Sequence, residues 1–174
     1  MPDLVRGEGF ADLFRRFSRS AWRWEAQGTY RQPDEAEPWQ RWREGVPATD
    51  DLEWLSPWLE DVRTATRAGR RFERVRVLTD PLTEYLRWQM EVTPANIAAG
   101  EVIRVLPEAD ARALDLPGYD FWLFDDERVA VLHFTANDLD GAEIITDPAT
   151  VARHRSWRDV AWRHAVAFED YAQP

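Results

Sequence analysis

Two residue types are missing from this 174-residue chain, and each absence removes whole classes of chemistry. There is no cysteine, which excludes disulfides, thiolate nucleophiles and cysteine-based zinc sites. There is no lysine either, so all 22 residues counted as lysine or arginine are arginine. The chain therefore has no P-loop lysine, no Schiff-base nucleophile and no lysine general base.

Histidine is scarce, and negative charges outnumber positive ones. His154 and His164 lie ten positions apart, which does not fit the i, i+4 pair of a helical zinc site, and His133 is the only other histidine. We therefore expect no metal site, and no stretch has the form of a cofactor-binding motif. The net charge of -10 argues against binding to duplex nucleic acid, because such binding needs a clustered positive face.

Long apolar runs are absent as well. Residues 1–8 contain no apolar core of a signal peptide, and no later run approaches a membrane-spanning length. We expect a cytoplasmic protein without a membrane segment. A hydrophobic fraction of 44% predicts a folded chain, and its length suits one domain over residues 1–174. Within it we expect an N-terminal subregion over residues 1–50 and an α/β core over residues 51–174.

Apolar strands form the main pattern of the C-terminal half. Residues 120–134 predict a hairpin, because Asp125-Asp126-Glu127 is the only polar break in this apolar run. Helical spacing elsewhere predicts helices between several strands, which favours an α/β fold, with α+β as the alternative. We expect a single mixed sheet with parallel pairs, flanked by helices. The other predicted strands are 18–27, 72–78, 101–106 and 142–146.

Proline and apolar spacing set the expected limits of two helices. A helix that starts near Thr79 is expected to end at Pro94, because proline lacks the backbone N–H that continues a helix. The final helix, from Pro148, is expected to extend to Phe168 and to pack across the sheet.

Residues 67–76 are the densest basic segment of this acidic protein and contain five arginines. Arg74 and Arg76 share one face of a predicted strand, and guanidinium groups bind carboxylates and phosphates bidentately. The candidate ligand site joins them with Arg104, Glu101 and Tyr85 near the C-terminal edge of the sheet, where open α/β sheets bind ligands. The alternative is that these arginines pair with the surplus carboxylates of the chain.

Other acidic residues have simpler interpretations. Glu25 lies on the strand face opposite Trp22 and Trp24, and we interpret it as a solvated strand residue. Asp125 and Asp126 are expected at an exposed hairpin tip, where turn geometry explains them better than acid–base catalysis. No catalytic residue is predicted.

Tryptophan is unusually frequent, with ten in the chain. Four of them, Trp39, Trp42, Trp54 and Trp58, lie in a polar, proline-rich segment. Exposed tryptophan beside arginine is typical of binding hot spots. This cluster is therefore the candidate surface for a protein partner.

Several segments together resemble a known family: residues 74–88, 100–106, 120–125 and 155–162, with Arg23-Trp-Glu and Tyr30. The family is an uncharacterised actinobacterial domain of unknown function, whose members are often encoded beside helix-turn-helix regulators. The resemblance covers most of the chain. It implies a helix-turn-helix regulator as partner and implies no activity.

The order of elements from Arg74 to the last helix also resembles, more distantly, one half of a phospholipase D-like domain. When residues 124–126 are placed on that family's hairpin, Gly118 takes the position of its histidine and Asp120 that of its lysine. His133 lies on the wrong side of the hairpin. This resemblance implies the architecture without the catalytic pair.

Two functions follow as expectations. The first is a non-catalytic regulatory or adaptor protein that contacts a helix-turn-helix transcription regulator. The alternative is a domain that binds a small anion or nucleotide through the arginine cluster, with weak enzyme activity as an extension of this role.

Overall fold

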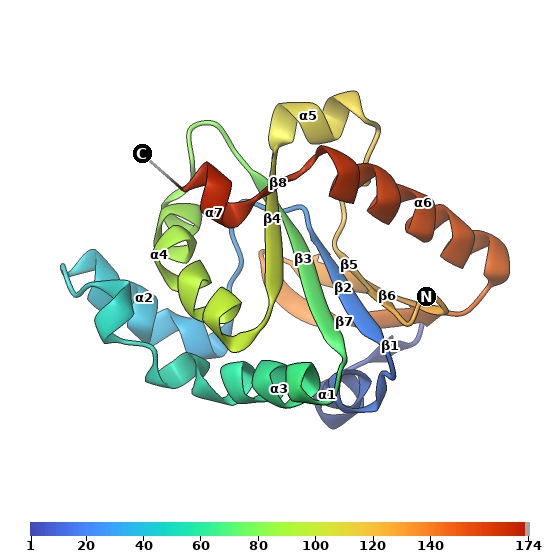
Figure 1. Ribbon diagram of the computed structural model, residues 1–174, viewed down its shortest axis with the longest axis horizontal. Coiled ribbons are helices and arrows are strands. Elements are labelled where there is room, and N and C mark those ends of the chain that lie inside the picture. Colours follow the sequence, from blue (N-terminus) through green and yellow to red (C-terminus); the bar gives the residue numbers. More distant parts are fainter. Residues whose placement is uncertain (173–174) are drawn as a thin grey trace.

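The computed structural model describes residues 1–172, in which one mixed sheet of eight strands is covered by helices on both faces (Figure 1). The α/β fold with a single mixed sheet is therefore confirmed. The strands are β1 (Leu4–Val5), β2 (Ser20–Glu25), β3 (Arg71–Leu78), β4 (Val102–Pro107), β5 (Phe121–Phe124), β6 (Arg128–Thr135), β7 (Asp138–Ile145) and β8 (Val166–Ala167). The α-helices are α1 (Gly7–Arg16), α2 (Ala36–Arg43), α3 (Ser56–Arg67), α4 (Glu84–Ala99), α5 (Glu108–Ala113), α6 (Pro148–His164) and α7 (Phe168–Tyr171).

The strands lie in the order β1-β7-β6-β5-β2-β3-β4-β8. Strands β2, β3 and β4 are parallel, as the helices between them require, whereas the remaining neighbours pair antiparallel. The sequence patterns do not predict β1 and β8, because strands of two residues are too short to show alternation. Strand β2 lies at the centre of the sheet, so the first residues of the chain contribute to the same core as the rest.

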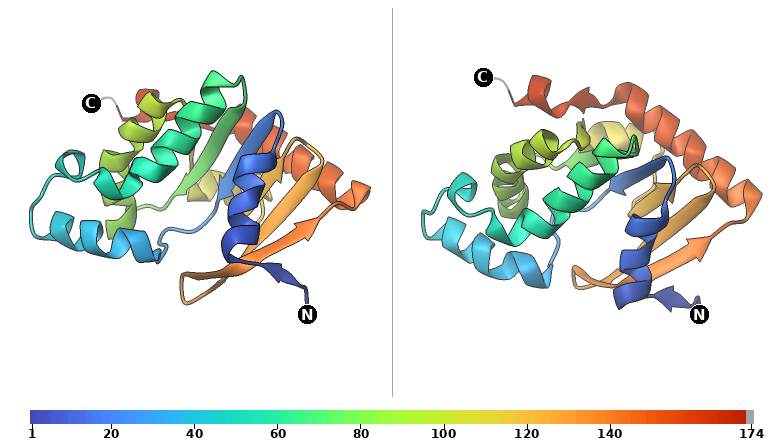
Figure 2. Two further views of the ribbon diagram at one scale, coloured as in Figure 1. Left: turned by 90° about the horizontal axis from the view of Figure 1, so that it is seen from below. Right: turned by 60° about the horizontal axis from the view of Figure 1, so that its bottom comes forward.

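The two faces of the sheet carry different helices (Figure 2). Helices α1, α3 and α4 pack on the face that presents Ala21, Phe72 and Trp122. Helices α5 and α6 pack on the opposite face, against Trp22 and Trp24. The predicted packing of the last helix across the sheet is thus confirmed. Within residues 1–172, no helix has both the length and the apolar character needed to cross a membrane.

Helix α4 continues through Pro94 to Ala99, so the prediction that Pro94 ends it is wrong. The missing hydrogen bond of an interior proline is offset by tertiary packing, since one side of α4 is buried from Tyr85 to Ala99. The helix ends instead at Gly100, whose φ of 119° is available to glycine without strain. A Cβ at this position would collide with Thr66 of α3.

Two other expected boundaries also differ from the structure. Strand β7 starts at Asp138 rather than at 142, because its pairing with β6 extends back to the turn at residues 136–137. Helix α6 ends at His164, where the chain extends to pair β8 with β4. Phe168 therefore belongs to α7 and packs with Leu78 at the edge of the sheet.

The predicted turn at Asp125 and Asp126 is present, and both residues have positive φ. The Asp125 carboxylate accepts hydrogen bonds from three backbone N–H groups at the start of β2, those of Ser18, Arg19 and Ser20. These bonds outweigh its partial burial and lower the pKa of Asp125. The hairpin tip thus anchors the central strand.

Candidate functional site

The floor of the candidate site is built by alternation on two central strands. Residues Arg23 and Glu25 of β2 point to the same face of the sheet as Arg74 and Arg76 of β3, because successive strand side chains alternate. The register places Arg23 beside Arg74 and Glu25 beside Arg76. Three arginines therefore share a single face of the sheet with the carboxylate of Glu25.

Glu25 bridges the two arginines of β3. Its Oε1 accepts a hydrogen bond from Arg76 Nε at 2.8 Å, and its Oε2 accepts one from Arg74 Nη1 at 2.8 Å. Burial alone would raise the pKa of Glu25, but the charges of Arg76, Arg74 and Arg23 outweigh it and lower the pKa to about 2. Glu25 is 3% exposed, so its interpretation as a solvated strand residue is wrong: helices cover this face of the sheet.

Two further carboxylates complete the charge balance. Glu101, delivered by the turn after Gly100, accepts hydrogen bonds from Arg74 Nε at 2.8 Å and from Asn96 Nδ2 at 3.0 Å. Asp120, just before β5, forms an ion pair with Arg23 at 2.7 Å. The buried guanidinium groups of Arg23 and Arg76 and the part-buried group of Arg74 thus face three buried carboxylates, and the formal charges of the cluster balance.

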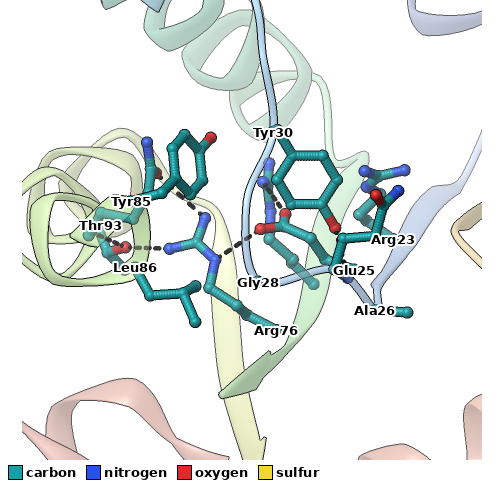
Figure 3. A network of polar contacts seen from close by, with 12 residues as sticks. Arg23, Glu25, Ala26, Gly28, Tyr30, Arg76, Tyr85, Leu86 and Thr93 are labelled. Atoms are coloured by element: carbon teal, nitrogen blue, oxygen red, sulfur yellow. Dashed lines mark hydrogen bonds and ion pairs between the residues drawn. The ribbon is translucent and has the colours of Figure 1, made fainter. Parts of the chain in front are cut away.

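Helix α4 supplies the neutral partners of the cluster. Arg76 reaches from β3 between Glu25 and Thr93, whose hydroxyl oxygen accepts from Arg76 Nη1 at 2.8 Å (Figure 3). Gln89 Oε1 accepts a longer bond of 3.4 Å from Arg76 Nη2. Every nitrogen of the Arg76 guanidinium group therefore has an acceptor.

The Asp120 carboxylate organises the other end of the cluster. It accepts hydrogen bonds from Tyr30 Oη at 2.6 Å and from Ala26 N at 2.9 Å, in addition to the bond from Arg23 Nη2. Burial raises the pKa of Asp120, and Arg23 opposes this shift in part. The segment after β2 is thereby fixed against the start of β5.

A cavity of about 540 Å3 lies above this floor. Its floor is formed by the sheet, and its sides by α1, α4, the start of α3 and residues 32–35. This volume is within the usual range for small-molecule sites. The aromatic residues of the lining are Phe10, Phe14, Trp54, Trp58 and Trp122, and its polar and charged residues are Arg15, Arg23, Gln32, Asp34, Glu35, Asp61, Arg74, Arg76, Gln89 and Asn96.

Two buried donors of the lining are unused. Among residues 1–172, Arg23 Nη1 and Gln89 Nε2 have no hydrogen-bond acceptor. Arg23 and Gln89 are 7% and 5% exposed. A buried donor without an acceptor costs about 1 to 3 kcal/mol. Such a group calls for a physical explanation, and completion by a bound molecule or water is one.

Glu35 brings a titratable group into the lining. Burial raises the pKa of Glu35 to about 7, although the hydrogen bond from Tyr85 opposes this shift. Tyr85 Oη lies 2.9 Å from Glu35 Oε2 and 3.1 Å from Oε1, and burial raises the pKa of Tyr85 as well. At neutral pH this carboxyl group can accept or donate a hydrogen bond.

The structure places the predicted ligand residues at three separate locations. Arg74, Arg76 and Glu101 meet in the buried cluster, on the middle of a sheet face rather than at its C-terminal edge. Tyr85 lies behind Glu35 and does not line the cavity. Arg104 points to the opposite face, where Nη1 donates to the Trp162 carbonyl oxygen at 2.7 Å.

The four predicted partner-binding tryptophans are all partly buried against the core. Trp54 and Trp58 line the cavity. Trp39 stacks on Trp88, and Trp42 Nε1 donates to Glu91. Half of this cluster therefore contributes to the wall of the cavity.

Sequence reasoning did not select Arg23, Glu35, Gln89, Asn96 or Asp120. In β2 the side chains of Arg23 and Glu25 alternate with those of two tryptophans. Because helices cover both faces of the central strands in an α/β fold, this alternation could have indicated that Arg23 and Glu25 are buried. Gln89 and Asn96 carried no such signal. Within the described part of the chain, no group of three or more His, Cys, Asp or Glu residues has the geometry to hold a metal ion.

Residues 8–173 match the sequence profile of a family described as a domain of unknown function, DUF6879. The chain belongs to this family. The expected membership of a family of unknown function is thus confirmed. A comparison with curated proteins found no match.

Replacing Glu25 tests the buried charge cluster. Glu25→Gln keeps the shape but leaves Arg74 and Arg76 without their shared anion, so we expect the free energy of unfolding to fall by about 3 to 5 kcal/mol in urea denaturation. In the parent chain this contribution is present above the ordinary glutamate pKa of 4.5 and is lost as the pH falls towards about 2. The control is Glu127→Gln, whose ion pair with Arg19 is exposed and contributes less than about 1 kcal/mol. Equal losses in both variants would contradict the assignment.

The raised pKa of Glu35 predicts a pH-dependent stability of opposite sign. Ionisation of Glu35 in the folded state is opposed, so stability is lost as the pH rises from 4.5 towards about 7. Glu35→Gln keeps an acceptor for Tyr85 and removes the charge. We expect it to stabilise the protein by about 3 kcal/mol near pH ~8 and hardly at all near pH ~4, measured by denaturation at each pH. The exposed Glu37→Gln variant is the control, and a gain that does not depend on pH would contradict the shift.

Proposed function

We propose that this domain binds a small organic molecule in the cavity above the central strands. The observation that carries the proposal is the pair of unused buried donors, Arg23 Nη1 and Gln89 Nε2, in the lining of a 540 Å3 cavity. Aromatic walls beside a few fixed polar groups are typical of ligand sites. Arg74 and Arg76 are paired with carboxylates, as the alternative interpretation of the arginine cluster expected. The proposal therefore keeps a ligand-binding function but assigns the unused donor to Arg23.

The proposed role of Arg74 and Arg76 is to hold the floor rigid. Both form ion pairs with Glu25, and Arg74 also forms one with Glu101. An anionic ligand that took the place of these carboxylates on the arginines would leave the carboxylates buried without a cation, which is costly in free energy. A simple site for phosphate or a carboxylate is therefore the less favoured form of this function.

The likeness to a phospholipase D-like half domain is proposed for the architecture alone. In that comparison Asp120 takes the lysine position, and here its carboxylate is occupied by Arg23, Tyr30 and a backbone amide. We propose no phosphodiesterase chemistry, since Gly118 provides no nucleophile.

Contact with a helix-turn-helix regulator is a second candidate function, and it is compatible with a ligand-binding role. It is favoured by the net charge of -10, since an acidic surface is complementary to the basic surface of a DNA-binding protein. The proposal includes an actinobacterial source and a helix-turn-helix regulator encoded by a neighbouring gene.

A ligand screen with a blocked cavity tests the first function. Ala11 of α1 lines the cavity and is partly exposed, so Ala11→Trp is expected to fill space without disturbing the polar floor. Thermal shift with a library of neutral and charged metabolites should give ligands that stabilise the parent chain; a ligand at about 100 times its Kd adds about 2.7 kcal/mol. These shifts should vanish in Ala11→Trp and persist in Ala152→Trp, an exposed position on α6. Shifts that survive in Ala11→Trp, or a library without any stabilising compound, would contradict the proposal.

Size-exclusion chromatography tests the second function. The chain mixed with the helix-turn-helix protein encoded beside it should elute as a complex at low salt. We expect the affinity to fall as salt is raised, because contact between opposite charges is screened. Separate elution at about 50 mM salt would count against this role, because the Debye length there exceeds ~10 Å.

A further inference from the structure

The charges around the cavity do not favour an anion. Arg23, Arg74 and Arg76 are balanced by three buried carboxylates. Arg15, at the rim, is already paired with Glu8 and with Asp12. The remaining charged residues of the lining are Asp34, Glu35 and Asp61. An anionic ligand would therefore meet unneutralised carboxylates and no free guanidinium charge.

Asp34 and Asp61 are exposed to solvent, so the groups available to a ligand deeper in the cavity are two N–H donors and the carboxyl group of Glu35. Arg23 and Gln89 lie on either side of the Glu25–Arg76 ion pair, and each has an unused N–H. Glu35 offers carboxyl oxygens in the same cavity, since the single hydroxyl proton of Tyr85 leaves acceptor capacity. A ligand that presents acceptors and a donor along one edge would match this set.

The aromatic walls favour a flat ligand. Phe14, Trp58 and Trp122 are in mutual contact, with ring centroids 4.9 to 6.2 Å apart. Trp54, also in the lining, stacks on Trp88 behind it and is held in place. Stacking of a heteroaromatic base on such a side chain is worth about 1 to 3 kcal/mol. An aliphatic ligand would gain nothing from the orientation of these rings.

We propose that the ligand is an uncharged, planar heteroaromatic molecule with hydrogen-bond acceptors beside a donor, the chemistry of a nucleobase or nucleoside. Its polar edge meets Arg23, Gln89 and Glu35, and its ring lies against the aromatic wall. This inference rests on the proposed ligand-binding function of the cavity.

Calorimetric titration of the full chain with adenosine, guanosine, cytidine and uridine, each compared with its 5′-monophosphate, tests the ligand class. At least one nucleoside should bind, and its monophosphate should bind at least tenfold more weakly, because the phosphate adds charge near Asp34 and Asp61. Tighter binding of the monophosphate would overturn the inference while leaving the proposed function intact.

Gln89→Met separates recognition from stability. Gln89→Met removes the unused Nε2 donor, which favours stability, and also the long 3.4 Å acceptor of Arg76 Nη2, which opposes it. Because these two effects offset each other, the ligand-free melting temperature should change little. Nucleoside affinity should fall at least tenfold, because the ligand loses the donor. Gln40→Met, at an exposed position outside the cavity, should leave the affinity unchanged. Unchanged affinity in Gln89→Met would overturn the inference.

The remaining outcomes distinguish this inference from the proposed function. If no nucleoside binds while another class of compound gives a shift that Ala11→Trp abolishes, the ligand class is wrong and the cavity is still the site. If no compound gives a shift sensitive to Ala11→Trp, both fail.

Discussion

The bridge from Glu25 to Arg74 and Arg76 is the interaction on which the rest of the structure depends. It joins the two central parallel strands on a buried face, at distances of 2.8 Å. Burial of these charges is tolerated only because each has a partner in good geometry. The bridge also reaches the helices, since Arg76 is held by Thr93 of α4 and Arg74 leads through Glu101 to Trp58 of α3. Helices and sheet are thereby fixed relative to one another.

Neutrality of the cluster decides the chemistry of the cavity above it. An unpaired arginine pair would attract anions, whereas arginines saturated by carboxylates act as rigid supports. What remains available is the part of the cluster that lacks a protein partner, on Arg23 and Gln89. The small number of free polar groups, set between aromatic walls, favours selection by hydrogen-bond pattern and shape rather than by charge.

The opposite face of the same strands is apolar instead of charged. There Trp22, Trp24 and Phe121 form an apolar layer under α6. The buried His154 of α6 has its Nδ1 2.8 Å from the Thr150 carbonyl oxygen, which requires the Nδ1–H tautomer and leaves Nε2 to accept from Tyr119. Burial lowers the pKa of His154, consistent with a neutral imidazole. This histidine therefore has a structural role.

Local patterns in the sequence were sufficient for the fold class. The hairpin around Asp125, the strand at 72–78 and the long helix from Pro148 all show periodicity that depends on neighbouring residues alone. Where a distant contact decides the outcome, local patterns failed. Pro94 is a helix breaker by itself, yet packing of α4 on the sheet carries the helix past it.

By itself, the sequence determined the α/β character, the family and the presence of Arg74, Arg76 and Glu101 in one polar cluster. The tertiary structure alone decided that Glu25 neutralises those arginines, that Arg104 lies on the other face and that Arg23 keeps a free donor. The physical reason is that alternation tells which residues share a face of one strand, whereas burial and pairing depend on which helix covers that face and on the register between strands far apart in the chain.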